Sequence, residues 1–118
     1  MSEFQIQRTE GANGACILRP VGPLTLQSVF QFQSAARAES ERPIVVDLTE
    51  VPYMDSVGLG SILGVFASCQ RTRRGFAVAG VAARVRTLFE VAKADRIIVV
   101  CDTAEAAEAQ ISVKTQQA

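Results

Sequence analysis

The chain has 118 residues, of which 48% are apolar and 20% charged, and it contains no histidine. This length and composition are typical of one globular domain rather than of a disordered chain. Without histidine, a Ser–His–Asp nucleophile system, a His-ligated metal site and a His general base are excluded. The 12 basic and 12 acidic side chains give a formal net charge of +0, which argues against general nucleic-acid binding because that requires an excess of cations.

The cysteines and the apolar stretches indicate where the protein resides. The three cysteines lie far apart with no Cys-x-x-Cys spacing, so we expect buried small side chains in a reducing compartment: Cys16, Cys69 and Cys101. The first ten residues lack the apolar run of a signal peptide. The most apolar uncharged stretch, 56–70, would span about 22 Å as a helix, less than the roughly 30 Å of a bilayer core. We therefore expect a soluble cytoplasmic protein without membrane contact.

The first half of the chain predicts a hairpin, a helix and a buried strand. Alternating apolar and polar residues over 3–9 and an apolar run over 15–21 predict two antiparallel strands, joined by a glycine-rich turn at 11–14. Apolar residues at helical spacing follow between 24 and 42, and a proline then ends the helix. The apolar run at 43–48 (PIVVDL) is typical of a central strand that is covered by helices on both faces.

The second half alternates helices with strands. Apolar residues at i, i+3, i+4 and i+7 predict one helical face at 59–66 and another at 85–92. Short apolar runs predict strands at 76–79 and 96–101. Strands that alternate with helices indicate parallel pairing through right-handed crossovers.

The C-terminal segment predicts a fourth helix. Asp102 and Glu105 have the spacing of a capping box, which would open an alanine-rich helix that runs to about residue 111, and 114–118 would be a frayed tail. The complete order is β-β-α-β-α-β-α-β-α. The sequence therefore predicts one α/β domain with a mixed, mostly parallel sheet and helices packed on it.

Residues 54–64 (MDSVGLGSILG) hold three of the eight glycines, although each glycine inside a helix costs roughly 1 kcal/mol relative to alanine. Known glycine motifs do not explain them. A dinucleotide fingerprint that starts at Gly58 would need glycine in place of Leu63. A nucleophile elbow would need glycine in place of Met54, and the chain has no Gly-Lys-Ser/Thr triplet of a phosphate-binding loop.

Asp47, at the end of a predicted strand, suggests the phosphorylated aspartate of a response-regulator receiver. Such a site also needs acidic residues after the first strand, where this chain has Ala12 and Asn13, and a lysine after a late strand. The only lysines are Lys93 and Lys114. The receiver hypothesis is therefore disfavoured.

Asp55 and Ser56 stand at the junction between a predicted loop and a helix. Either residue is a preferred helix cap, worth about 1 kcal/mol, and this structural role alone would explain them. The functional interpretation is that Ser56 is phosphorylated. The free N–H groups of a helix N-terminus tolerate a phosphate there, which would add a charge of roughly −2.

The predicted helix after Ser56 has an unusual outer face. If its large apolar side chains point inward, the opposite side carries small uncharged residues where a solvated face normally has Lys and Glu: Val57, Ser61, Gly64 and Ser68. Such a face suits reversible protein binding. The alternative, weighed equally, is that Gly60 and Gly64 allow close packing against another part of the same domain.

Together these residues carry a family resemblance. The segment 54–64, preceded by IVVDL at 44–48, closely resembles the signature of STAS domains, specifically of bacterial anti-sigma factor antagonists. The resemblance extends over about residues 4–112 and includes the Gly22-x-Leu24 turn and VRTLFEVAKADRII at 85–98. It implies a single STAS domain over 1–118, with its core at about 4–112.

The resemblance also implies a mechanism. The unphosphorylated protein would bind an anti-sigma factor that is also a serine kinase, and thereby release the sigma factor. The kinase, which itself binds ATP and Mg²⁺, would phosphorylate Ser56 and weaken binding, and a PP2C-type phosphatase would reverse the modification. No enzyme activity, cofactor or direct nucleic-acid contact is expected of the chain itself, and a homodimer stays open. The expected partner contacts are Thr25, Asp55, Ser56, Val57, Gly58, Gly60, Ser61, Gly64 and Ser68.

Two positions depart from the family pattern. Thr25 stands where many relatives carry Asp, in a loop that lies beside the phosphorylation site in the family fold, and Val57 stands where relatives often carry Ser or Thr. One alternative is therefore a STAS scaffold subunit of a stress-signalling or lipid-transport complex without a kinase cycle. An enzyme or nucleotide-binding protein is a further alternative, disfavoured because the chain lacks histidine, a phosphate loop and a convergent acid pair.

Overall fold

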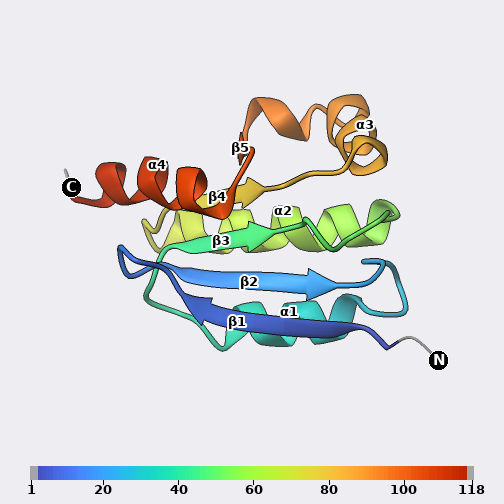
Figure 1. Cartoon of the computed structure of the whole chain (residues 1–118), viewed down its shortest axis with the longest axis horizontal. Coiled ribbons are helices and arrows are strands. Elements are labelled where there is room, and N and C mark those ends of the chain that lie inside the picture. Colours follow the sequence, from blue (N-terminus) through green and yellow to red (C-terminus); the bar gives the residue numbers. More distant parts are fainter. Residues whose placement is uncertain (1–2, 117–118) are drawn as a thin grey trace.

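The computed structural model describes residues 3–116, with side chains up to Ile111, as one α/β domain (Figure 1). The elements follow the predicted order, with one short 3₁₀ helix added before the last strand. In chain order they are β1 (Gln5–Glu10), β2 (Cys16–Val21), α1 (Val29–Arg37), β3 (Ile44–Asp47), α2 (Ser56–Arg71), β4 (Phe76–Ala79), α3 (Ala83–Val91), η1 (Ala94–Arg96), β5 (Val99–Cys101) and α4 (Ala104–Gln116).

The sheet has the strand order β1-β2-β3-β4-β5. Strands β1 and β2 pair as an antiparallel hairpin, and each of the following pairs is parallel. The predicted mixed, mostly parallel sheet is therefore confirmed. All four residues of β3 are buried, because this central strand has a neighbour on each side and helices over both faces.

Helices cover the two faces of the sheet unequally. Along β3 the side chains alternate, so that Ile44 and Val46 join a large core with α1, α2 and α3, while Val45 joins a smaller core beneath α4. Figure 1 shows α1 and α2 side by side, and these helices are in contact. The C-terminal ends of β2 and β3 and the N-terminal ends of α1 and α2 consequently meet at one edge of the domain.

Helix α1 is shorter than predicted at both ends. It begins at Val29 rather than near residue 24 because Leu24 forms a parallel bridge with Met54, which requires extended backbone. It ends at Arg37 rather than at residue 42 because the carboxylate of Glu39 accepts hydrogen bonds from the N–H groups of the two residues that follow Ser40. This turn competes with continuation of the helix.

The last strand is also shorter than predicted. Lys93 adopts a left-handed conformation with φ +61°, which ends α3, and the 3₁₀ helix η1 then replaces the start of the expected strand at 96–101. Only Val99–Cys101 pair with β4, and these residues are half-buried rather than buried. The reason is that β5 is an edge strand with a single neighbour.

The start and end of α4 differ from the prediction as well. The hydroxyl of Thr103 accepts a hydrogen bond from the N–H of Ala106 at 3.1 Å, so Thr103 caps the helix in place of the expected Asp102–Glu105 box. The helix continues to Gln116, beyond the predicted end near residue 111. Residues 117–118 lie outside the described part of the chain.

The cysteines match the expectation with one exception. None of the three is in a disulfide, and Cys16 and Cys69 are buried. Cys101 is partly exposed, and its thiol lies 3.4 Å from the side-chain oxygen of Gln110. Its place on the edge strand explains the exposure.

Candidate functional site

The N-terminus of α2 is capped by Asp55, one of the two residues predicted for this role. Asp55 has the extended backbone of a cap residue, and its Oδ1 accepts a hydrogen bond from the N–H of Gly58 at 2.8 Å. This bond is the main reason that the pKa of Asp55 lies below its usual value. The carboxylate at the start of α2 is therefore ionised at neutral pH and held in one orientation.

The same carboxylate joins two loops that are far apart in the sequence. Its Oδ2 accepts a hydrogen bond from the N–H of Leu26 at 3.1 Å. The N–H of Leu24 donates to the carbonyl of Tyr53 at 3.2 Å, and Leu24 forms the bridge with Met54. The loop between β2 and α1 therefore lies directly against the segment that leads into α2, as the family resemblance implied for the Thr25 loop.

Thr25 is built into its own turn. Its Oγ1 accepts a hydrogen bond from the N–H of Gln27, and its N–H donates to the hydroxyl of Ser28 at 3.0 Å. The Ser28 hydroxyl, which is buried, donates to the carbonyl of Pro23 at 2.8 Å. Thr25 thus stabilises the loop with a neutral side chain. Ser28 is a supporting residue that the sequence analysis missed.

Ser56 is the first residue of α2 and is exposed. Its hydroxyl forms no hydrogen bond with any residue in the described range 3–116. Because Asp55 already caps the helix, the Ser56 hydroxyl has no structural role there. It is free to react or to contact another molecule.

Exposed apolar side chains stand on the chain segments next to Ser56: Tyr53 and Val57 are close to it in sequence, and the N–H of Leu26 binds the carboxylate of the adjacent Asp55. Leu26 is 62% exposed, and Tyr53 and Val57 are each 41% exposed. The guanidinium of Arg84 on α3 lies 5.3 Å above the Tyr53 ring. We call Leu26, Tyr53, Ser56 and Val57 the Ser56 surface. The sequence analysis identified Ser56 and Val57 but missed Leu26 and Tyr53, whose only signal was an apolar side chain inside a predicted loop or at the start of a predicted helix.

The three glycines of the motif have different roles. A Cβ atom at Gly58 would collide with the carbonyl oxygen of Leu24, so glycine is required where α2 passes the β2–α1 loop. A Cβ at Gly60 or Gly64 would meet no other atom within 4 Å. The close-packing alternative is therefore wrong for Gly60 and Gly64, and that role belongs to Gly58.

The small residues of α2 do not form one exposed face. Ser61 is only 4% exposed, and its hydroxyl donates to the carbonyl of Gly58 at 2.6 Å. Together with Gly64 and Ser68, it lines a groove between α1 and α2. The predicted single docking face is thus divided: Val57 lies beside Ser56 at the start of the helix, and the other three residues face the groove, because α1 covers this side of α2.

Asp47, considered above as a receiver aspartate, is a buried structural carboxylate. It accepts hydrogen bonds from Arg19, at 2.9 Å to Nη2, and from the N–H of Thr49 at 3.0 Å. Burial would raise the pKa of Asp47, but the hydrogen bonds from Thr49 and Arg19 outweigh it and lower the pKa. Within the described residues, no three Cys, Asp or Glu side chains are grouped so that they could hold a metal ion.

The comparisons with known proteins agree with this geometry. The model of the STAS domain family matches residues 4–107. The chain is 42% identical to an anti-sigma-B factor antagonist of Listeria monocytogenes serovar 1/2a over 53 residues. This match covers 45% of the chain and 46% of that relative, so it spans about half the relative's length.

Two solved structures have the same fold. An anti-sigma factor antagonist from Mycobacterium paratuberculosis superimposes with a TM-score of 0.81 at 18% identity, covering 92% of this chain and 94% of that chain. The anti-sigma factor antagonist SpoIIAA in its unphosphorylated form gives a TM-score of 0.72 at 17% identity, covering 97% and 98%. In the described part of this chain, no helix has the length and apolar character needed to span a membrane. Because the model of this family matches residues 4–107, which is most of the sequence, the chain belongs to the STAS domain family.

Proposed function

We propose that the protein is an anti-sigma factor antagonist that binds its anti-sigma factor through the Ser56 surface and is switched off by phosphorylation of Ser56. The observation that carries this proposal is the exposed Ser56 hydroxyl, which has no partner within residues 3–116 and is flanked by exposed Leu26, Tyr53 and Val57. Exposed apolar side chains around a small polar residue suit a contact that forms and dissociates. The name of the Listeria relative supports the antagonist class.

A phosphate on Ser56 would act on binding rather than on folding. The helix cap is made by Asp55, so the fold does not depend on the Ser56 hydroxyl. The phosphate would add a charge of about −2 beside the ionised Asp55 carboxylate. A partner surface shaped for neutral serine and apolar neighbours would have to desolvate this charge, so the complex would dissociate.

The chemistry of the switch would come from the partners. In this proposal, the anti-sigma factor is a serine kinase that binds ATP and Mg²⁺, and a PP2C-type phosphatase removes the phosphate. The protein contributes a substrate hydroxyl and a binding surface, and no catalytic group. The description of SpoIIAA as unphosphorylated fits a family in which this modification state matters.

The test is a phosphorylation and binding experiment with each serine-kinase-type anti-sigma factor of the same organism. With ATP and Mg²⁺, mass spectrometry should detect one phosphate on Ser56 and none on Ser56→Ala. Ser56→Ala should retain binding to the kinase, whereas Ser56→Asp should weaken it at least tenfold. Ser34→Ala, which changes an exposed serine on α1, is the matched control and should behave like the unchanged protein.

Two outcomes would contradict the switch. One is a phosphate mapped to another residue, and the other is equal kinase affinity for Ser56→Asp and Ser56→Ala. The scaffold alternative, in a stress-signalling or lipid-transport complex, would be favoured if substitutions of Ser56 do not change partner binding. Co-purification with a transporter ATPase, or a large homo-assembly, would add to this. The neutral Thr25, which stabilises its own turn beside Ser56, is the feature that keeps this alternative in view.

A further inference from the structure

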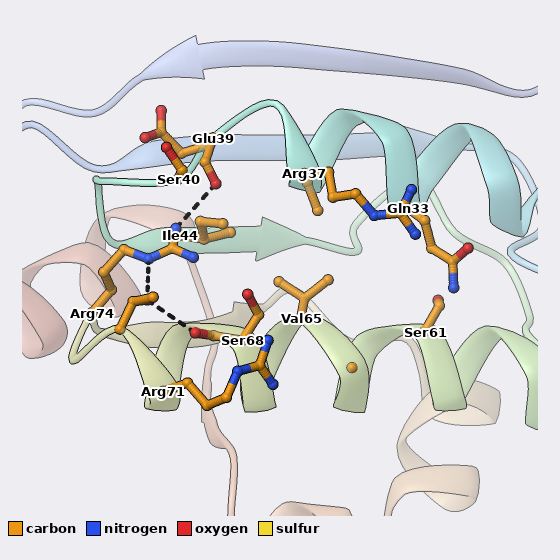
Figure 2. A pocket seen from close by; sticks show the side chains of 13 residues that line it. Gln33, Arg37, Glu39, Ser40, Ile44, Ser61, Val65, Ser68, Arg71 and Arg74 are labelled. Carbon is orange, nitrogen blue, oxygen red and sulfur yellow. Dashed lines mark hydrogen bonds between the residues drawn. The ribbon is translucent and has the colours of Figure 1, made fainter.

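The groove between α1 and α2 runs along α2 from Ser61 to the C-terminal end of the helix (Figure 2). Its volume is about 450 Å³, within the range of small-molecule sites. Arg71 is 15 residues beyond Ser56 on the same helix, so the two are about 22 Å apart along its axis at 1.5 Å per residue. The arginine-lined end of the groove is therefore separate from the Ser56 surface, although the groove extends along α2 as far as Ser61.

Arginines from both walls give the groove a positive charge. Arg37 belongs to the last turn of α1, Arg71 to the last turn of α2, and Arg74 to the segment that follows α2. Of the residues that the structure describes, Glu39 is the only acidic one that lines the groove. Three cations and one anion leave a net charge of +2 in a protein whose overall formal charge is +0.

The carboxylate of Glu39 is already neutralised by other groups. Its Oε1 accepts from Arg8 at 2.8 Å, and its Oε2 accepts from the N–H groups of Glu41 and Arg42 at 2.9 and 2.8 Å. Glu39 is only 8% exposed. It therefore does not occupy the arginines across the groove, and the positive charge is open to a ligand.

The three arginines differ in their freedom. Arg74 is fixed, because its Nε donates to the Thr72 hydroxyl at 2.7 Å and its Nη1 to the carbonyl oxygens of Glu39 and Arg42, each at 3.1 Å. The guanidinium groups of Arg37 and Arg71 form no ion pair or hydrogen bond with any residue in the range 3–116. Each cation interacts favourably with the negative end of its own helix dipole. This interaction does not explain why both side chains line the same groove.

The rest of the groove combines an apolar base with hydroxyl groups. Ala36, Ile44 and Val65 are buried side chains along it, and a Cβ at Gly64 would meet nothing within 4 Å, so this part of the wall is open. Figure 2 shows the amide of Gln33 pointing from α1 towards Ser61 on α2. The remaining hydroxyl-bearing residues that line the groove are Ser40, Ser68 and Thr72.

We propose that this groove binds a phosphate group of a small molecule through the free guanidinium groups of Arg37 and Arg71, with the remainder of the ligand on the apolar side chains that line it. Phosphate suits this site because two guanidinium groups can each bind it with two hydrogen bonds, whereas one carboxylate is matched by a single guanidinium. The ligand is a soluble phosphorylated compound or the phosphate headgroup of a lipid. The proposal does not depend on phosphorylation of Ser56.

The test uses the full ¹⁵N-labelled chain and inorganic pyrophosphate at constant ionic strength. We expect saturable shifts of the backbone amides of Ser40, Gly64, Ser68 and Thr72, while the amides of Ser56 and Val57 stay in place. A sodium chloride titration at equal ionic strength should not reproduce these shifts. The second arm measures co-sedimentation of the protein with phosphatidylglycerol vesicles and uses phosphatidylcholine vesicles as the comparison. Binding to the phosphatidylglycerol vesicles alone would identify a lipid headgroup as the source of the phosphate.

The variants Arg37→Gln and Arg71→Gln should each weaken pyrophosphate binding about tenfold, because each loses a charge-assisted contact. Arg86→Gln, which changes an exposed arginine on α3, is the matched control and should bind normally. Both groove arginines are exposed, so the variants should fold, and their amide spectra check this. Amide shifts that do not saturate, or that centre on residues 55–57, would overturn the proposal. So would an equal loss of pyrophosphate affinity in Arg86→Gln, or the absence of arginine-dependent binding to both pyrophosphate and vesicles. Ser56→Ala should leave binding unchanged, which separates this result from the switch.

Discussion

The two ends of α2 have opposite chemistry. At the start, Asp55 places an ionised carboxylate beside Ser56, and the surrounding exposed side chains are mostly apolar. At the other end, Arg37, Arg71 and Arg74 line a groove whose only acidic residue is neutralised elsewhere. Under the two proposals, a phosphate on Ser56 would weaken partner binding at one end, whereas the phosphate of a ligand would be bound at the other. One helix carries two surfaces, and variants can alter each of them separately.

The largest effect on the N-terminal end is expected from Gly58→Ala. The new Cβ would collide with the Leu24 carbonyl and push α2 away from the β2–α1 loop, which should lower the free energy of unfolding by about 3 kcal/mol. Urea unfolding followed by circular dichroism measures this change. Gly60→Ala is the control with open space, and it should leave stability equal or raise it by up to about 1 kcal/mol. Equal losses in both variants would show that the contact with Leu24 is not what requires glycine.

Removal of the cap should have the next largest effect. Asp55→Ala loses the acceptor for both Gly58 and Leu26, so we expect a loss of about 1–2 kcal/mol in the free energy of unfolding. Asp55→Asn retains an acceptor oxygen and should lose less. If the cap also positions the β2–α1 loop, the Leu26 amide should exchange with solvent faster in Asp55→Ala, while the groove amides remain unchanged. Unaltered exchange at Leu26 would argue against this link.

An apolar-to-polar change on the Ser56 surface should weaken partner binding with little effect on stability. Leu26→Ser removes an exposed apolar side chain next to Ser56, and we expect about tenfold lower affinity for the anti-sigma factor in calorimetry. Val91→Ser changes a side chain that is 76% exposed on α3 and serves as the control. If both variants bind equally well, the surface does not include Leu26.

The smallest effect concerns the dependence of stability on pH. Hydrogen bonds, above all the one from the N–H of Gly58, lower the pKa of Asp55. Burial would raise the pKa of Glu39, but hydrogen bonds from the N–H groups of Glu41 and Arg42 and the charge of Arg8 outweigh it and lower the pKa. Both folded pKa values lie below the unfolded value of about 4, so the stabilisation is complete above that pH and is lost as the pH falls through the folded pKa. Urea unfolding between pH 7 and 3 should show a smaller decline for Asp55→Asn and Glu39→Gln. Glu90→Gln, which changes an exposed carboxylate on α3, should match the unchanged protein.

Much of the fold was predictable from local patterns. Alternation and apolar runs located each strand, and the apolar spacing along α2 located its buried face. The predicted ends of helices and strands were wrong where hydrogen bonds to other segments or side chains compete with the local preference for helix or strand. Leu24 is extended because it pairs with Met54. The segment after α1 turns because the Glu39 carboxylate, held by Arg8, accepts hydrogen bonds from the N–H groups of the residues after Ser40. Short-range propensity carries no information about such partners.

In the candidate site, too, features set by neighbouring residues were predictable and features set by contacts between distant segments were not. A cap at Asp55 or Ser56 was predicted because Asp and Ser are both preferred at that position, and the structure has Asp55 in this role. Leu26 and Tyr53 were missed because their place beside Ser56 depends on contacts between the β2–α1 and β3–α2 loops. Glu108 is another residue of this kind. It is buried in α4 and accepts hydrogen bonds from the N–H groups of Asn13 and Ala15, about ninety residues earlier in the chain.

By itself, the sequence determined the order of the elements, the central place of β3, the capped start of α2 and the exposed serine after the cap, because each follows from side chains within one or two turns. Only the tertiary structure decided that Gly58 rather than Gly60 or Gly64 is the close contact, that Ser61 is buried, and that arginines from two helices line one groove. These features arise where α1 and α2 pack side by side on the sheet. The crossing of two helices brings together residues that no local periodicity relates.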